Sequence, residues 1–143
     1  MSDGTDDWIA MIQENITDRL RYLMIPLNIL AKEAGVSFNG WQGIRFIRGY
    51  RHNVDLYTFD TIAMVLKTKP ADLLRPDYSP NHISYEMNME DIGISNEKAI
   101  ENLHIYDRKL RYKLNSGRQL GIRLRTLYRL AQEENVDPST LIS

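Results

Sequence analysis

The chain has 143 residues, of which 43% are hydrophobic and 26% are charged, and its formal net charge is −1. This length suits one ordinary domain or two small units that share a core. The absence of cysteine excludes disulfides, thiol nucleophiles and cysteine metal sites. No apolar run approaches the roughly 18 residues of a membrane span, and the short acidic start is unlike a secretory signal, so we expect a cytoplasmic protein without a membrane partner.

Two helices are predicted in the first part of the chain. The first begins near Thr5, whose side chain can cap it, and extends to Leu23, because isoleucine and leucine recur at three- and four-residue steps. Pro26 is tolerated in the first turn of a helix and therefore opens a second one, 27–34, which Gly35 ends. The apolar stripe of the first helix predicts that it packs against other elements.

Three short helical segments are expected next. A helix over 39–48 follows a tight turn, although Gly40 and Gly43 each cost about 1 kcal/mol relative to alanine in a helix interior. Another helix covers 58–67, with apolar residues on one face, and a last helical turn begins near Pro70. This part of the chain is therefore predicted to be entirely helical.

A linker is predicted over 76–94, because its first residues include prolines and a serine that break helices. Within it, apolar and polar residues alternate over 83–89, which is the two-residue period of a half-buried strand. A single strand in a helical chain would pair with the same strand of a second molecule, or would lie as a clasp along the surface. The alternative is an extended linker without strand pairing.

An internal repeat relates the helical parts on either side of this linker. Residues 58–74 match 126–142 at a separation of 68 residues, with threonine, alanine and proline at equivalent positions. Gly49 matches Gly117 at the same separation. We therefore expect two tandem copies of one helical unit, the second one degenerate and without an obvious first helix. The first unit, the linker and the second unit are placed at 1–75, 76–94 and 95–143.

Four short motifs follow one another in the first unit: LAKEAGVS at 30–37, a basic stretch ending in Arg48 and Gly49, FDTIA at 59–63 and PADLL at 70–74. This pattern, over about residues 16–74, resembles the lambda-repressor-like helix-turn-helix family of phage repressors and Cro proteins. The resemblance implies an all-α fold of tandem helix-turn-helix units. It also implies that 37–48 is the segment that enters the major groove and reads bases.

The residues that would contact DNA in the first unit are assigned by their chemistry, because the segment is about two residues longer than is typical of that family. The amides of Asn39 and Gln42 can pair bidentately with adenine. The guanidinium groups of Arg45 and Arg48 can pair with guanine or phosphate, and Arg51 lies where it would contact the backbone. The expected DNA-binding residues of the first unit are Ser37, Asn39, Gln42, Arg45, Arg48 and Arg51.

Basic residues are also concentrated in the second unit. No acidic residue lies between Asp107 and Glu133, and a helix predicted over 107–115 carries its basic side chains outside an apolar pair. The alternative is that these side chains form a solvated surface. The expected DNA-binding residues of the second unit are Arg108, Lys109, Arg111, Lys113 and Arg118.

The sequence thus predicts a repressor-type transcriptional regulator of bacterial or phage origin that binds specific sequences of double-stranded DNA. Two units on one chain could read two unlike half-sites, which lie about 34 Å apart on one face of the duplex. The alternative arrangement is a homodimer formed through the second unit or through 83–89.

No feature of the sequence indicates catalysis, a cofactor or a metal ion. The three histidines, His52, His82 and His104, have no carboxylate or second histidine at ligand spacing, and there is no phosphate-binding loop. We therefore do not expect an enzyme. The main alternative to DNA binding is a helix-turn-helix scaffold that binds or inhibits another protein, as part of a mobile element. The aromatic residues that would form such an interface are Trp41, Phe46, Tyr50 and Tyr57.

Overall fold

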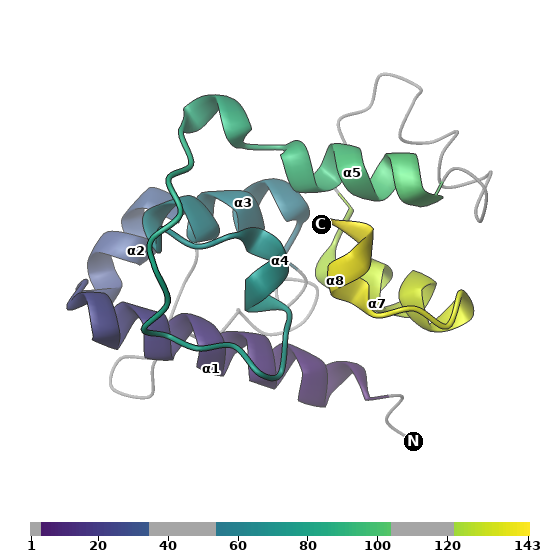
Figure 1. Cartoon of the computed structure of the whole chain (residues 1–143), viewed down its shortest axis with the longest axis horizontal. Helices are drawn as coiled ribbons and strands as arrows, with labels where there is room; N and C mark the ends of the chain where they lie inside the picture. Colours follow the sequence, from purple (N-terminus) through teal and green to yellow (C-terminus); the bar gives the residue numbers. More distant parts are fainter. Residues whose placement is uncertain (1–3, 35–53, 104–121) are drawn as a thin grey trace.

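A computed structural model of the chain describes residues 4–34, 54–103 and 122–143 (Figure 1). The α-helices of the first unit are α1 (Thr5–Leu23), α2 (Leu27–Ala34), α3 (Leu56–Val65) and α4 (Pro70–Leu73). The second unit contains α5 (Ile94–Leu103), α7 (Leu124–Glu133) and α8 (Pro138–Leu141), and a short 3₁₀ helix, η3 (Met89–Asp91), lies in the linker. These residues contain no β-strand, so the all-α prediction is confirmed for the part of the chain that they cover.

The first two helices begin and end where the sequence pattern places them. The apolar stripe of α1 is buried, whereas its acidic first turn is exposed. The helix is not capped by the Thr5 side chain, because Gly4 occupies the N-cap position in a left-handed conformation with a φ of 89°. Asp55 caps α3 by accepting a hydrogen bond from the Thr58 amide, so this helix begins two residues before the predicted range.

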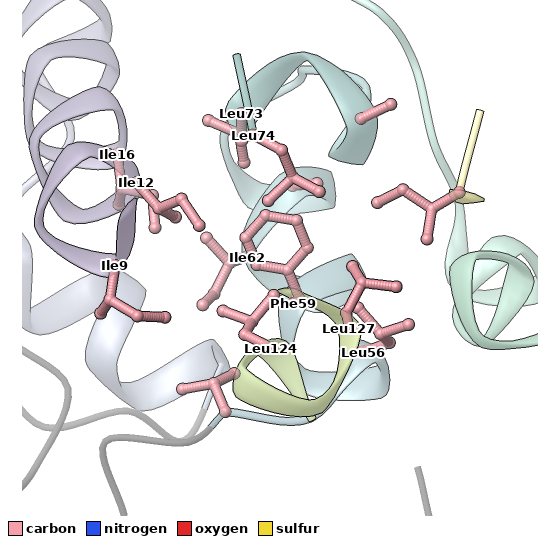
Figure 2. Packing of buried hydrophobic residues seen from close by; sticks show 14 of the residues in the cluster. Ile9, Ile12, Ile16, Leu56, Phe59, Ile62, Leu73, Leu74, Leu124 and Leu127 are labelled. Carbon is pink, nitrogen blue, oxygen red and sulfur yellow. The ribbon is translucent and has the colours of Figure 1, made fainter. Parts of the chain in front are cut away.

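One hydrophobic core serves both units (Figure 2). It contains residues from α1, α3, α4, α7 and α8, and Figure 2 shows the side chains of α3 and α7 in the same part of the core. The residues labelled there are Ile9, Ile12, Ile16, Leu56, Phe59, Ile62, Leu73, Leu74, Leu124 and Leu127. Full burial of each such side chain contributes about 1.5–3 kcal/mol to the free energy of unfolding. The two units are therefore stabilised by the same core.

The sequence repeat is present in the structure for four helices. The first residue of α7 lies 68 positions after the first residue of α3, and α8 follows α4 at the same separation. One residue in each connection adopts a left-handed conformation. It is Lys67 between α3 and α4, with a φ of 51°, and Asn135 between α7 and α8, with a φ of 55°. Both short helices begin with a proline. The pairs α3–α4 and α7–α8 are thus copies of one structural motif.

An isolated antiparallel β-bridge joins the two copies. The Leu56 amide donates a hydrogen bond to the Ile122 carbonyl at 2.8 Å, and the Leu124 amide donates one to the Val54 carbonyl at 2.9 Å. Leu124 and Ile122 lie 68 residues after Leu56 and Val54, respectively. Equivalent residues of the two copies therefore exchange equivalent bonds, which is the pattern of a local twofold axis.

The strand expected over 83–89 does not form within the described chain, and its pairing with a second molecule stays a prediction. Residues 83–88 form no β-ladder within the described part of the chain, and the Tyr85 amide donates a hydrogen bond to the Lys67 carbonyl at 2.9 Å. Ile83 is 93% exposed and Met89 is 73% exposed, whereas Met87 packs against the core. The alternating residues belong to a linker without strand pairing, which was the alternative to a strand, and Ser84 and Tyr85 attach it to the first unit by hydrogen bonds.

The side chain of Arg19 fastens this linker to the first unit. It is fully buried in α1, on the side that packs against the core. Its guanidinium group donates hydrogen bonds to the carbonyl oxygens of Leu66, Lys67, Pro80 and His82 and to the hydroxyl of Ser84. The first two carbonyls lie at the C-terminal end of α3, where a positive charge is favourable. One buried cation thus holds the end of α3 and the beginning of the linker together.

Candidate nucleic-acid interface

The residues expected to contact DNA all lie outside the described part of the chain. They fall in two stretches, 35–53 in the first unit and 104–121 in the second. The expected residues are Ser37, Asn39, Gln42, Arg45, Arg48, Arg51, Arg108, Lys109, Arg111, Lys113 and Arg118. The structure describes the elements that come directly before and after each stretch. These flanking elements support the stretches and define the candidate interface.

In the first unit the supporting elements are α2 and α3, which pack against each other. Leu30 is fully buried and Ala34, the last residue of α2, is also buried, whereas Ala31 is only partly buried. Leu30 therefore anchors α2 on the core, and Ala34 adds a second buried contact one turn further along the same helix.

In the second unit the stretch leaves from α5 and returns at Ile122. The Ile122 amide donates a hydrogen bond to the side-chain oxygen of Asn96 at 2.7 Å, and both residues are buried. Asn96 belongs to α5, and α5 packs against α3 of the first unit. Ile122, the first described residue after the second stretch, is therefore held by α5 of its own unit and by the β-bridge to the first unit.

The two stretches end next to each other at the β-bridge. Val54 and Ile122 are the first described residues after them, and both are buried. Each of these residues accepts a hydrogen bond from the opposite copy through its carbonyl oxygen. The local twofold axis therefore relates the two points, Val54 and Ile122, at which the stretches rejoin the described chain.

The charges around the bridge differ between the units. Asp55 of the first unit pairs across the bridge with Arg123 of the second, which is exposed and makes no side-chain cap on α7. Further along α7, Arg125 forms an ion pair with Asp6 at 2.7 Å. Arg129 forms one with Glu133 at 3.0 Å. These exposed pairs contribute at most about 1 kcal/mol each, but they neutralise part of the basic character that the sequence assigns to 108–129.

A buried carboxylate joins the two units near the start of α5. Asp60 of α3 is fully buried, and one of its oxygens accepts hydrogen bonds from the Gly93 amide at 2.9 Å and the Ser95 amide at 3.1 Å. Burial raises the pKa of Asp60 above its ordinary value of 3.8, although the amide hydrogen bonds act in the opposite direction. These contacts make Asp60 the N-terminal cap of a helix from the other unit, which is a structural role.

Sequence reasoning missed the buried polar residues that hold distant segments of the chain together, Asn15, Arg19, Asp60 and Asn96. A signal for two of them was present, because Asn15 and Arg19 are four residues apart and lie beside the apolar stripe of α1. A polar side chain on a buried helix face must find hydrogen-bond partners, and here it finds them in other elements.

A surface pocket of about 290 Å³ lies between α4, α5, the linker and the last residues of the chain. Its lining contains the basic residues Lys69, Arg75 and Lys98 together with the acidic residues Asp72 and Asp91. Opposite charges are mixed there, and Arg75 approaches Asp72 to 3.9 Å. The described lining of the pocket thus presents no single charge to a ligand.

The described residues contain no group of histidine and carboxylate side chains that could hold a metal ion, and none of their helices has the length and apolar character needed to cross a membrane. The chain matches no protein-family model, and comparison with curated proteins and with solved structures gives no match. Function is therefore inferred from the residues and geometry of this chain.

Proposed function

We propose that this protein is a DNA-binding transcriptional regulator of the repressor type. The observation that carries the proposal is the β-bridge, which holds the ends of the two basic stretches together across a local twofold axis. Helix-turn-helix regulators bind DNA as pairs of units related by twofold symmetry, because the DNA backbone has twofold axes perpendicular to the duplex. A chain with two such units has the same arrangement within one molecule.

Electrostatics supports the same partner. The two stretches contain many basic side chains and, from 34 to 54 and from 108 to 132, no acidic residue. Affinity for DNA comes largely from such phosphate contacts and falls as salt rises, because each contact releases bound counterions. The low net charge of the chain does not oppose this, since its acidic residues lie elsewhere in the sequence.

The experiment that tests the proposal is a titration of fluorescent double-stranded DNA at several salt concentrations. We expect salt-dependent binding by the parent protein, and weaker binding by Arg45→Ala and Arg108→Ala. Arg21→Ala is the matched control, because Arg21 is an exposed arginine of α1 outside both stretches. Absence of binding even at low salt would contradict the proposal.

A second candidate function, binding to another protein, is favoured by exposed apolar side chains. Met24 is 88% exposed at the end of α1, and Ile83 and Met89 project from the linker. Of the aromatic residues expected at such an interface, Tyr57 is described, and its ring packs against Gly93 while the side chain stays partly exposed. This candidate would replace the first if the protein did not bind DNA at low salt.

A further inference from the structure

The pocket beside α4 and α5 is formed by both units and by the linker between them. Its volume of about 290 Å³ is close to the lower end of the range of small-molecule sites, about 300–1,000 Å³. The described lining comes from α4, from the linker, from the first part of α5 and from Ile142. α8, which ends directly before Ile142, packs against both α4 and α5 (Figure 1). Such junctions between units are a common place for ligand sites.

The lining residues are held in place by contacts with other parts of the chain. The Tyr85 amide donates a hydrogen bond to the Lys67 carbonyl at 2.9 Å, and the Lys69 ammonium lies 5.1 Å from the centroid of the Tyr85 ring. On the other side of the pocket, the Ser95 amide donates a hydrogen bond to the carboxylate of Asp60 at 3.1 Å. The pocket is therefore formed without a ligand, as small-molecule sites usually are.

Apolar side chains supply a large part of the lining. Met87 is partly buried and packs against the core, and Ile142 is buried, whereas Ile94 and Tyr85 stay substantially exposed. Apolar surface therefore extends from the core to the solvent-exposed edge of the pocket. A ligand with an apolar body would remove this exposed surface from water, which is favourable.

The two acidic side chains of the lining already have partners within the chain. Asp72 lies 3.9 Å from the guanidinium group of Arg75. The carboxylate of Asp91 accepts a hydrogen bond from the Asn88 amide at 2.9 Å. These two carboxylates therefore offer little to a cationic ligand, although they still repel an additional negative charge.

The two lysines of the lining are more available. Lys69 comes directly before α4, and Lys98 belongs to α5. Among the described residues, neither ammonium group forms an ion pair with a carboxylate. The nearest acidic group on the α5 side, Asp60, is close enough for Lys98 to lower its pKa, but its carboxylate is buried and accepts backbone amides. One ammonium group from each unit is thus available at the same pocket.

We propose that this pocket binds a small organic monocarboxylate with an apolar body. The carboxylate binds Lys69 and Lys98 through charge-assisted hydrogen bonds, and the body covers the apolar part of the lining. A dianion such as a phosphate ester fits less well, because Asp72 and Asp91 also line the pocket. The site is formed by both units, so an occupied pocket stabilises their arrangement and raises the melting temperature. This inference does not depend on DNA binding.

An NMR titration of the full chain with isotope-labelled methionine methyl groups tests the proposal. The probes are phenylacetate, the neutral phenylacetamide and phenyl phosphate. We expect phenylacetate to shift the Met87 signal saturably, whereas the signal of Met24, which is 88% exposed at the end of α1, stays unchanged. No shift of Met87, or equal binding of phenylacetamide, would overturn the proposal. Tighter binding of phenyl phosphate would overturn the choice of a monocarboxylate.

Substitution of the lysines identifies the groups that bind the carboxylate. Lys69→Gln and Lys98→Gln should each weaken phenylacetate binding by about tenfold and reduce the rise in melting temperature that phenylacetate causes. The matched control is Lys32→Gln, because Lys32 is an exposed lysine of α2 outside the described lining, and it should leave both values unchanged. Parent-like affinity of both pocket variants would overturn the proposal. Circular dichroism verifies that each variant keeps the parent's helical content.

Discussion

Asp55 and Arg123 pair across an isolated antiparallel bridge, although 68 residues separate them in the sequence. Each is the residue that precedes a helix of the shared core, α3 or α7. The bridge therefore joins the two units at the points where the stretches expected to bind DNA end. Buried residues of both units belong to the same cluster, so a substitution in the core of one unit should lower the free energy of unfolding of the whole molecule.

Leu124→Ala should destabilise the entire chain in a single step. Leu124 is fully buried at the start of α7, and such a truncation costs about 2–5 kcal/mol of unfolding free energy. Thermal unfolding followed by circular dichroism and by tryptophan fluorescence, which reports on the first unit because both tryptophans lie there, should give coincident transitions at a lower temperature. Val136→Ala is the control, because Val136 is 41% exposed whereas Leu124 is fully buried. Two separate transitions would show that the units unfold independently.

Arg19→Met should be strongly destabilising, by about 3 kcal/mol or more. Methionine keeps much of the side-chain volume but leaves the carbonyl groups at the end of α3 and in the linker without their buried donor. The matched control is Arg21→Met, two residues further along α1 and exposed, which should change the free energy of unfolding by less than about 0.5 kcal/mol. Urea titrations measure both values, and equal effects of the two substitutions would contradict the structural role of Arg19.

The charge of Asp60 should make stability depend on pH. Burial raises its pKa in the folded state above 3.8, so the folded chain binds the proton more tightly than the unfolded chain does. Its contribution to stability is fully present below pH 3.8 and is lost as pH rises through the raised pKa. Asp60→Asn keeps an oxygen that can accept the amide hydrogen bonds but cannot ionise.

The free energy of unfolding of the Asp60→Asn variant, measured by urea titration, should therefore rise relative to the parent between about pH 3.8 and neutral pH. A difference that stays constant over this range would show that the carboxyl group titrates with the same pKa in both states. Asp77→Asn is a suitable control, since Asp77 is exposed in the linker.

Asn15→Ala and Asn102→Ala should both destabilise the chain, by unequal amounts. Asn15 is buried and donates to the Leu73 carbonyl and to the Arg75 carbonyl, whereas Asn102 donates to Leu141 and is exposed. We expect about 1–3 kcal/mol for the buried residue and about 1 kcal/mol or less for the other. Melting temperatures of the two variants, compared with Asn28→Ala in the exposed part of α2, measure these effects. A larger loss for Asn102 would contradict this order.

Local pattern was sufficient for most helices of the first unit. The bounds of α1 and α2 follow from spacing and proline placement, because helix formation depends on neighbours three and four residues away. The same local pattern was misleading at 83–89, since alternation describes an extended chain and does not supply the second strand that pairing requires. The residues expected to bind DNA lie outside the described structure, so their roles stay predictions.

The sequence by itself determined the helical class, the repeat of 58–74 in 126–142 and the concentration of basic residues in two stretches, because each is a property of composition or of short-range spacing. Only the tertiary structure decided that α5 is the counterpart of α1, that Arg19 holds the linker, and that Asp60 caps a helix of the other unit. The first of these follows because an asparagine of each helix donates a hydrogen bond to the equivalent carbonyl of its own unit. These three relationships join residues 33 to 65 positions apart or compare contacts made at opposite ends of the chain. A buried polar group must be paired, but local sequence does not specify which distant atom becomes its partner.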